Sequence, residues 1–137
     1  MMLISNAKSL KYFIPRMNFQ KSNHRQVFEV KTSLGYKMVD SNHIVFLEAK
    51  GKFTIIHFKD HSNIITFQML IWYSKYLFEP CFFRSHNSYI VNCSYINYYT
   101  NKEIIMMQGP KVPLSRRRSS SFKENLKYFF LIQTKTF

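Results

Sequence analysis

Apolar and polar residues alternate in short runs over most of the chain from residue 27 onward, and polar turns separate the runs. Residues 27–32 (VFEVKT) and 36–39 (YKMV) flank Gly35, and this arrangement predicts a β-hairpin. The later runs are rich in β-branched and aromatic residues, which favour strands. Further strands are therefore predicted at 43–49, 53–58, 64–68, 95–99, 103–108 and 111–115.

One segment between these runs follows a helical spacing instead. In residues 69–78 (MLIWYSKYLF), Leu70, Tyr73 and Leu77 recur on one helical face. Pro80 follows just beyond the segment and acts as a stop signal. We expect one short helix here.

A second helical pattern lies near the C-terminus. Phe122, Leu126 and Phe129 are spaced by four and three residues, which predicts a C-terminal helix. Ser115 is a candidate N-cap for this helix, and 119–121 would serve if the helix begins later. The whole pattern predicts a mainly β, antiparallel protein with two helical segments.

Composition adds a strong charge to this picture. The chain has 137 residues, enough for one domain, and 46% of them are apolar, so a packed core can form. Twenty Lys and Arg residues against seven Asp and Glu residues give a net charge of +13. Such an imbalance predicts a polyanionic partner, either nucleic acid or an anionic membrane surface.

No apolar run reaches the roughly 18 residues that a membrane helix needs, and the first residues lack the apolar core of a signal peptide. Cys81 and Cys93 form no CxxC pair. We interpret them as reduced structural thiols of a cytoplasmic protein. The five histidines are scattered without metal-ligand spacing, so we expect no metal and no other cofactor.

Three clusters of charged and hydrogen-bonding side chains fall between predicted strands or at the end of an element. They are 50–52 (Lys-Gly-Lys), 84–88 (Arg-Ser-His-Asn-Ser) and 116–118 (three arginines). Arg, Lys and Ser hold phosphates, whereas Asn and Arg can also pair with base edges through two hydrogen bonds. Loops on a rigid sheet often carry such binding residues.

Each cluster also has an interpretation without a ligand. Residues 50–52 could form a solvated turn. Residues 84–88 could be a polar network that joins two strands, with Asn87 and Ser88 capping their own backbone. Positive charge at a helix start opposes the macrodipole. The arginines at 116–118 are therefore expected to contact phosphate or bases, unless they lie ahead of the helix and are merely exposed.

Catalysis by a serine and a histidine is the other function that this region raises. Neighbouring residues on a strand point to opposite faces, so Ser85 and His86 would not meet. His86 and Ser88 could share a face, but no acidic residue lies nearby in the sequence to orient the imidazole. We expect no enzyme and no catalytic residues.

The motif FFRSHNSYIVN at 82–92, followed by Gly109 and by PLSRRR at 113–118, resembles the LytTR DNA-binding domain of bacterial transcription regulators. The run HIVFLEAKGKFTIIHF at 43–58 is similar to an earlier part of that family's pattern. The resemblance covers about residues 27–130.

This resemblance implies an elongated, mainly β fold of small antiparallel sheets, with one short central helix and a C-terminal helix. It implies loops that enter successive major grooves of DNA, and an Asn87 that prefers adenine. The candidate base contacts are Asn87, Arg117, Lys50, Lys52 and Thr54. The candidate phosphate contacts or loop-positioning residues are Arg84, Ser85, His86, Ser88, Ser115, Arg116 and Arg118.

The expected organisation is a basic N-terminal tail (1–26), a LytTR-like domain (27–132) and a C-terminal tail (133–137). Many proteins of the family also carry a receiver domain or a membrane segment, and we expect neither here. A signal would then arrive through protein level, through a separate signalling partner or through the N-terminal tail. The family's use of direct repeats implies a homodimer on DNA.

The main alternative is a module that binds RNA or DNA without sequence preference and stacks bases on exposed Tyr and Phe. A third interpretation is an adaptor for anionic membranes. The positive charge, however, falls in predicted loops and tails and not on a basic amphipathic helix. We therefore expect double-stranded DNA as the partner, with no membrane and no small-molecule substrate.

Overall fold

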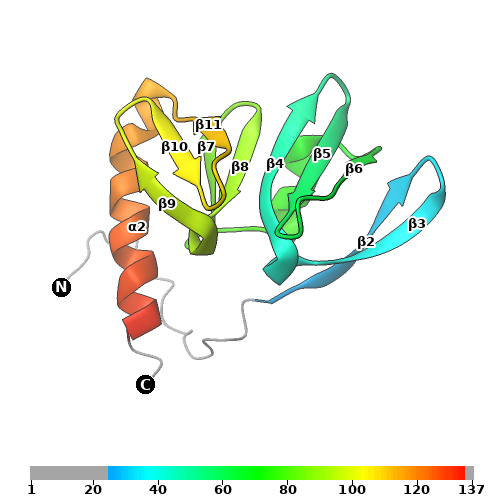
Figure 1. The fold of residues 1–137 in the computed structure, drawn as a ribbon, viewed down its shortest axis with the longest axis horizontal. Coiled ribbons are helices and arrows are strands. Elements are labelled where there is room, and N and C mark those ends of the chain that lie inside the picture. Colours follow the sequence, from blue (N-terminus) through cyan, green and yellow to red (C-terminus); the bar gives the residue numbers. More distant parts are fainter. Residues whose placement is uncertain (1–24, 135–137) are drawn as a thin grey trace.

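The structure is a computed structural model that describes residues 25–134. The strands are β2 (Val27–Thr32), β3 (Gly35–Asp40), β4 (Ile44–Lys50), β5 (Phe53–Phe58), β6 (Asn63–Thr66), β7 (Phe82–His86), β8 (Tyr89–Asn92), β9 (Ile96–Tyr99), β10 (Glu103–Met106) and β11 (Lys111–Pro113). They form a central five-stranded sheet in the order β6-β5-β4-β8-β7, the hairpin β2-β3 and a three-stranded sheet in the order β11-β10-β9, all antiparallel (Figure 1). Helix α2 (Ser119–Thr134) follows at the C-terminus. The predicted mainly β fold of small antiparallel sheets is confirmed.

The central sheet is covered on both faces, which gives the protein two hydrophobic cores. One core lies between this sheet, the three-stranded sheet and α2, and includes Phe83, Val91 and Phe122. The other lies between the central sheet, the β2-β3 hairpin and the segment after β6, and includes Leu47, Ile56 and Tyr73. A strand buried on both faces needs a continuous apolar run, and the IVFL sequence of β4 supplies it.

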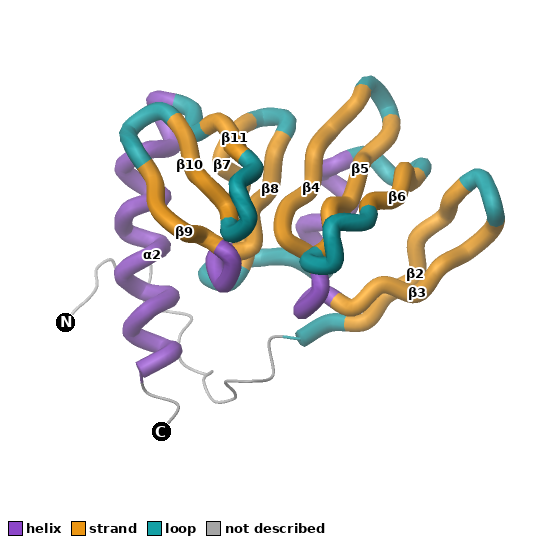
Figure 2. The backbone as a smooth tube through the Cα atoms, in the orientation of Figure 1, coloured by secondary structure: helices purple, strands orange, loops and turns teal. Residues whose placement is uncertain are grey.

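Over residues 25–134, the helical segments before α2 are short and of the 3₁₀ type. Figure 2 draws them and α2 in purple. The helix expected over 69–78 is a 3₁₀ helix, Leu70–Lys75, and therefore shorter than predicted. The amide of Tyr76 donates to the carbonyl of Tyr73, three residues back, at 3.0 Å. The predicted apolar face is confirmed, because Leu70, Tyr73 and Leu77 are all buried.

The C-terminal helix buries the predicted residues Phe122, Leu126 and Phe129. Its start differs from the first expectation. A 3₁₀ turn, Arg116–Arg118, precedes α2, and the side chain of Ser115 makes no capping hydrogen bond. The arginines therefore lie ahead of the α-helix. The helix runs through Thr134, two residues into the segment predicted as a C-terminal tail.

Residues 1–24 of the predicted N-terminal tail and residues 135–137 lie outside the described residues. The described part begins with Arg25, which pairs with Asp40 at 2.9 Å, and with Gln26, whose carbonyl accepts from the amide of Ser41. Cys81 and Cys93 are free thiols. Burial raises the pKa of Cys81 to about 12 and also raises the pKa of Cys93. Thiolate reactivity needs a lowered pKa, so this environment suits structural thiols.

Candidate nucleic-acid interface

The three polar clusters predicted from the sequence lie at one end of the molecule. The turn between β4 and β5, the turn between β7 and β8 and the 3₁₀ turn Arg116–Arg118 all lie along the upper edge in Figure 1. Two backbone hydrogen bonds connect them. The amide of Ala49 donates to the carbonyl of Ser88 at 2.8 Å, and the amide of Ser115 donates to the carbonyl of Ser85, also at 2.8 Å.

A bulge in β7 shapes the middle turn. The pairing register between β7 and β8 shifts between Arg84 and His86, and His86 then pairs with Tyr89. The amide of Ser88 donates to Nδ1 of His86 at 3.1 Å, and the His86 ring lies edge-on to Tyr89. These contacts make His86 a support of the turn and leave Asn87 exposed at its tip.

Three arginines converge on Asn87. Nη2 of Arg84 donates to the main-chain oxygen of Asn87 at 2.6 Å. Nη2 of Arg118 donates to Oδ1 of Asn87 at 3.1 Å, and Nη2 of Arg117 reaches the same atom at 3.4 Å. Arg118 also donates through Nη1 to the carbonyl of Arg84 at 3.3 Å. The β7–β8 turn and the 3₁₀ turn Arg116–Arg118, which we call the arginine segment, are about thirty residues apart in the sequence. They form one unit, which we call the arginine cluster (Arg84, Asn87, Arg117, Arg118).

No carboxylate of residues 25–134 forms an ion pair with this cluster. Within residues 25–134, Asp40, Glu48 and Glu124 do form ion pairs, but their partners lie outside the cluster. These partners are Arg25, His43, His57 and Lys127. Burial, and then the nearby charge of Arg118, lowers the pKa of Arg84. An anionic ligand would offset this repulsion between guanidinium groups.

Several polar atoms of the cluster and of two neighbouring serines are buried. Among the described residues, Nε of Arg84, Nε of Arg118, Oγ of Ser85 and Oγ of Ser115 have no hydrogen-bond partner. Ser85 is fully buried and joins the arginine segment through its main chain, so its position suits loop support and not a direct phosphate contact.

The turn between β4 and β5 contributes Lys50 and Lys52, both exposed. Gly51 between them has φ +60°, a left-handed conformation that glycine adopts readily. Thr54, in contrast, is fully buried, and its hydroxyl donates to the carbonyl of Gln68 at 2.8 Å. That burial does not fit a base contact, and we leave Thr54 out of the interface.

Glu48 was not among the predicted site residues, yet it lies behind the same end of the sheet. It accepts a hydrogen bond from the hydroxyl of Tyr89 at 3.4 Å and lies 3.0 Å from Nε2 of His57. The ring of His57 stacks on Phe46 at 4.1 Å. The Leu-Glu-Ala pattern of the family resemblance was the signal for this position. The contacts make Glu48 a link between β4, β5 and β8.

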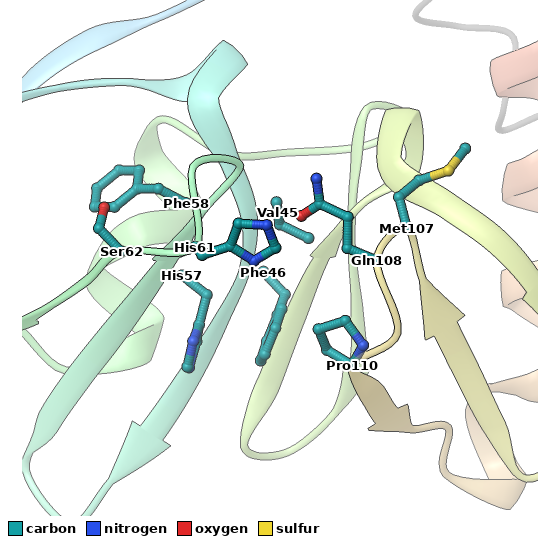
Figure 3. Close-up of a pocket in the computed structure, with 9 residues that line it drawn as sticks. All are labelled: Val45, Phe46, His57, Phe58, His61, Ser62, Met107, Gln108 and Pro110. Carbon is teal, nitrogen blue, oxygen red and sulfur yellow. The ribbon is translucent and has the colours of Figure 1, made fainter.

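A separate pocket of about 250 Å³ lies between the β5–β6 turn and the β10–β11 turn (Figure 3). His61 and Gln108 project into it from the two sides, and both have positive φ angles, 73° and 75°. In an antiparallel sheet, the β5–β6 turn lies at the opposite end of β5 from the β4–β5 turn. The pocket is therefore distinct from the arginine cluster.

A β-rich domain that presents arginine and lysine from turns, with no ion pair between the arginine cluster and a carboxylate of the described residues, has the features of a nucleic-acid-binding module. A family model, the LytTr DNA-binding domain, matches residues 35–127. The chain belongs to the LytTR DNA-binding domain family. It is a DNA-binding domain of the kind found in transcription regulation.

A solved structure supports this assignment. The chain is similar to the "LytTr DNA-binding domain of putative methyl-accepting/DNA response regulator from Bacillus cereus", with 28% sequence identity and a TM-score of 0.62. The match covers 73% of this chain and 95% of that one. A search of the curated proteins gave no match. Over the described residues, no helix has the length and apolar character needed to cross a membrane.

Proposed function

We propose that this chain recognises a specific sequence in double-stranded DNA and acts as the DNA-reading part of a bacterial transcription regulator. The observation that carries the proposal is the arginine cluster around an exposed asparagine. Its guanidinium groups form no ion pair with a carboxylate of the described residues. DNA supplies anionic phosphates to such a surface and base edges to its side chains.

The proposed roles follow from exposure and contacts. Asn87 and Arg117 are exposed at the tip of the cluster and would contact bases in the major groove. Lys50 and Lys52 would contact bases or phosphates from the neighbouring turn. Phosphate contacts are assigned to Arg84, Arg116 and Arg118, and support of the turns to Ser85, His86, Ser88 and Ser115.

Two further elements of the proposal concern the assembly. We expect two copies to bind adjacent direct repeats, as a homodimer that forms on DNA. We also expect the regulatory signal to reach the domain through protein level, the N-terminal tail or a separate signalling partner. Small molecules and membranes have no part in the proposal.

The test is selection of bound duplexes from a random library by the purified protein at physiological salt. A short enriched motif, repeated in one orientation, would support sequence-specific binding by a pair of copies. Asn87→Ala and Arg117→Ala should each cost about 1 to 3 kcal/mol on that motif and little on random DNA. Asn97→Ala is the matched control, because Asn97 is an exposed asparagine on β9.

Retention of DNA without any motif would contradict the proposal. Competition between duplex and single-stranded probes would then test the alternative, a module that binds nucleic acid without sequence preference. A uniform loss of affinity across all sequences for Asn87→Ala would remove its role as a base reader and leave it as a support of the turn.

A further inference from the structure

The arrangement of Asn87 restricts what its side chain can read, and this inference rests on the proposed function. Its two acceptor atoms are already engaged within the protein. Oδ1 accepts from Arg118 at 3.1 Å and from Arg117 at 3.4 Å, and the main-chain oxygen accepts from Arg84 at 2.6 Å. Because arginine has donors only, the atom of the Asn87 amide that faces Arg117 and Arg118 must be the oxygen.

The free part of the Asn87 side chain is therefore its amino group, Nδ2. A free asparagine pairs with adenine in two places, because it donates to N7 and accepts from the N6 amino group. With Oδ1 occupied, the second of these hydrogen bonds cannot form without breaking a contact to arginine. The same restriction applies to the N4 amino group of cytosine. Adenine N7 and thymine O4 each offer one acceptor to this amino group, whereas guanine offers two adjacent acceptors, O6 and N7, and no donor.

Arg118 is the stronger of the two contacts to Oδ1. Its side chain is half-buried, and its Nη1 is held by the carbonyl of Arg84 at 3.3 Å. The exposed Arg117, with the longer contact, keeps more freedom to reach DNA. We propose that Arg118 sets the base preference of Asn87 by holding its oxygen, so that the arginine cluster prefers guanine over adenine. Arg118 is thus a specificity-determining residue that acts through Asn87.

The experiment uses the full chain and the motif from the duplex selection. The base position read by Asn87 is the motif position at which the unmodified protein discriminates between bases and the Asn87→Ala variant does not. At that position the unmodified protein should prefer guanine over adenine by about 5- to 150-fold, the range of a good two-point base contact. A wild-type preference for adenine at this position would overturn the inference while leaving the proposed function intact.

Arg118→Met removes the contact to Oδ1, and Arg116→Met is its matched control. Arg116 lies two residues away in the same 3₁₀ turn, is exposed, and has no hydrogen bond to Asn87. Both variants should lose affinity through the lost positive charge. Only Arg118→Met should reduce the ratio of guanine to adenine affinity, by about fivefold or more. An equal ratio in the two variants would overturn the role of Arg118.

A second measurement does not depend on the folding of the Arg118 variant. Replacing the guanine by 7-deazaguanine deletes the N7 acceptor and should weaken binding of the unmodified protein by about fivefold or more. Asn87→Ala, a change at an exposed turn residue, should be less sensitive to this replacement. If the unmodified protein binds both probes equally, the inference fails. If the selection yields no motif at all, both the proposed function and the inference fail.

Discussion

The buried ring of Phe122 packs helix α2 against two sheets, close to the arginine segment. Truncating this ring tests how much that packing stabilises the domain. Phe122 is fully buried, and its ring lies 5.3 Å from Phe83 on β7 and 5.1 Å from Tyr99 on β9. Ser85, two residues after Phe83, accepts the hydrogen bond from Ser115 that fixes the start of the arginine segment. The same ring therefore supports the core and the base of the proposed interface.

Phe122→Ala deletes this ring and leaves a cavity between α2 and two sheets. Phenylalanine to alanine changes in a packed core cost about 3 to 5 kcal/mol, because transfer free energy and cavity terms add. A domain of this kind has a free energy of unfolding of about 5 to 15 kcal/mol. We expect Phe122→Ala to remove a large part of that stability.

The assay is urea denaturation followed by far-UV circular dichroism, with the slope of the transition compared between variants. The matched control is Phe130→Ala, the same substitution on the same helix at a residue that is 54% exposed. Because the Phe130 ring still packs edge-on against Phe129 at 5.5 Å, this change should lower the free energy of unfolding by about 1 kcal/mol or less. A loss below about 1 kcal/mol for Phe122→Ala, or equal losses for both variants, would refute this account of the core.

Three further predictions concern other parts of the molecule. Arg116→Ala should flatten the slope of log K against log salt by about 0.9, because one phosphate contact is lost. Gly51→Ala should destabilise the domain by about 1 kcal/mol, since Gly51 has φ +60° and alanine is strained there. Burial raises the pKa of Tyr73 to about 12. Because an unfolded tyrosine ionises near pH 10, the free energy of unfolding should decrease between about pH 10 and pH 12. In the Tyr73→Phe variant this decrease should be smaller.

Each of these predictions has a matched control or an outcome that would contradict it. Lys123→Ala, which removes a positive charge on α2, should leave the salt slope nearly unchanged; an equal flattening would mean that long-range charge and not a phosphate contact is responsible. Gly51→Asn should cost less than Gly51→Ala, because asparagine tolerates a left-handed backbone. At neutral pH, Tyr73→Phe should lower the free energy of unfolding by about 1 kcal/mol, because it removes the hydrogen bond between the Tyr73 hydroxyl and Thr66. If the free energy of unfolding fell equally with pH above pH 10 in the unmodified protein and in Tyr73→Phe, the raised pKa of Tyr73 would be contradicted.

Much of the fold could be predicted from local pattern. The β2-β3 hairpin, the strands and the buried face of α2 follow from alternation or helical spacing, which depend only on near neighbours in the sequence. Alternation also offered a signal against Thr54. It lies two residues before the buried Ile56 on β5 and therefore on the same inward face. The family resemblance favoured a different role for it.

The 3₁₀ form of Leu70–Lys75 could not be predicted from the pattern. The same apolar residues would serve an α-helix, and the observed form depends on packing against the sheet and on the contact between Tyr73 and Thr66. The bulges in β4 and β7 could not be predicted either, because a bulge is defined only by how a strand pairs with its neighbour.

By itself, the sequence determined the strand and helix periodicities, the net charge of +13 and the presence of an Arg-rich segment and an Asn-bearing turn. These are properties of composition and of neighbouring residues. The tertiary structure decided that Arg117 and Arg118 reach Asn87 across about thirty residues of chain. It also decided which side-chain atoms remain free for DNA. Hydrogen bonds between distant residues depend on sheet register, and that register is fixed only when the cores pack.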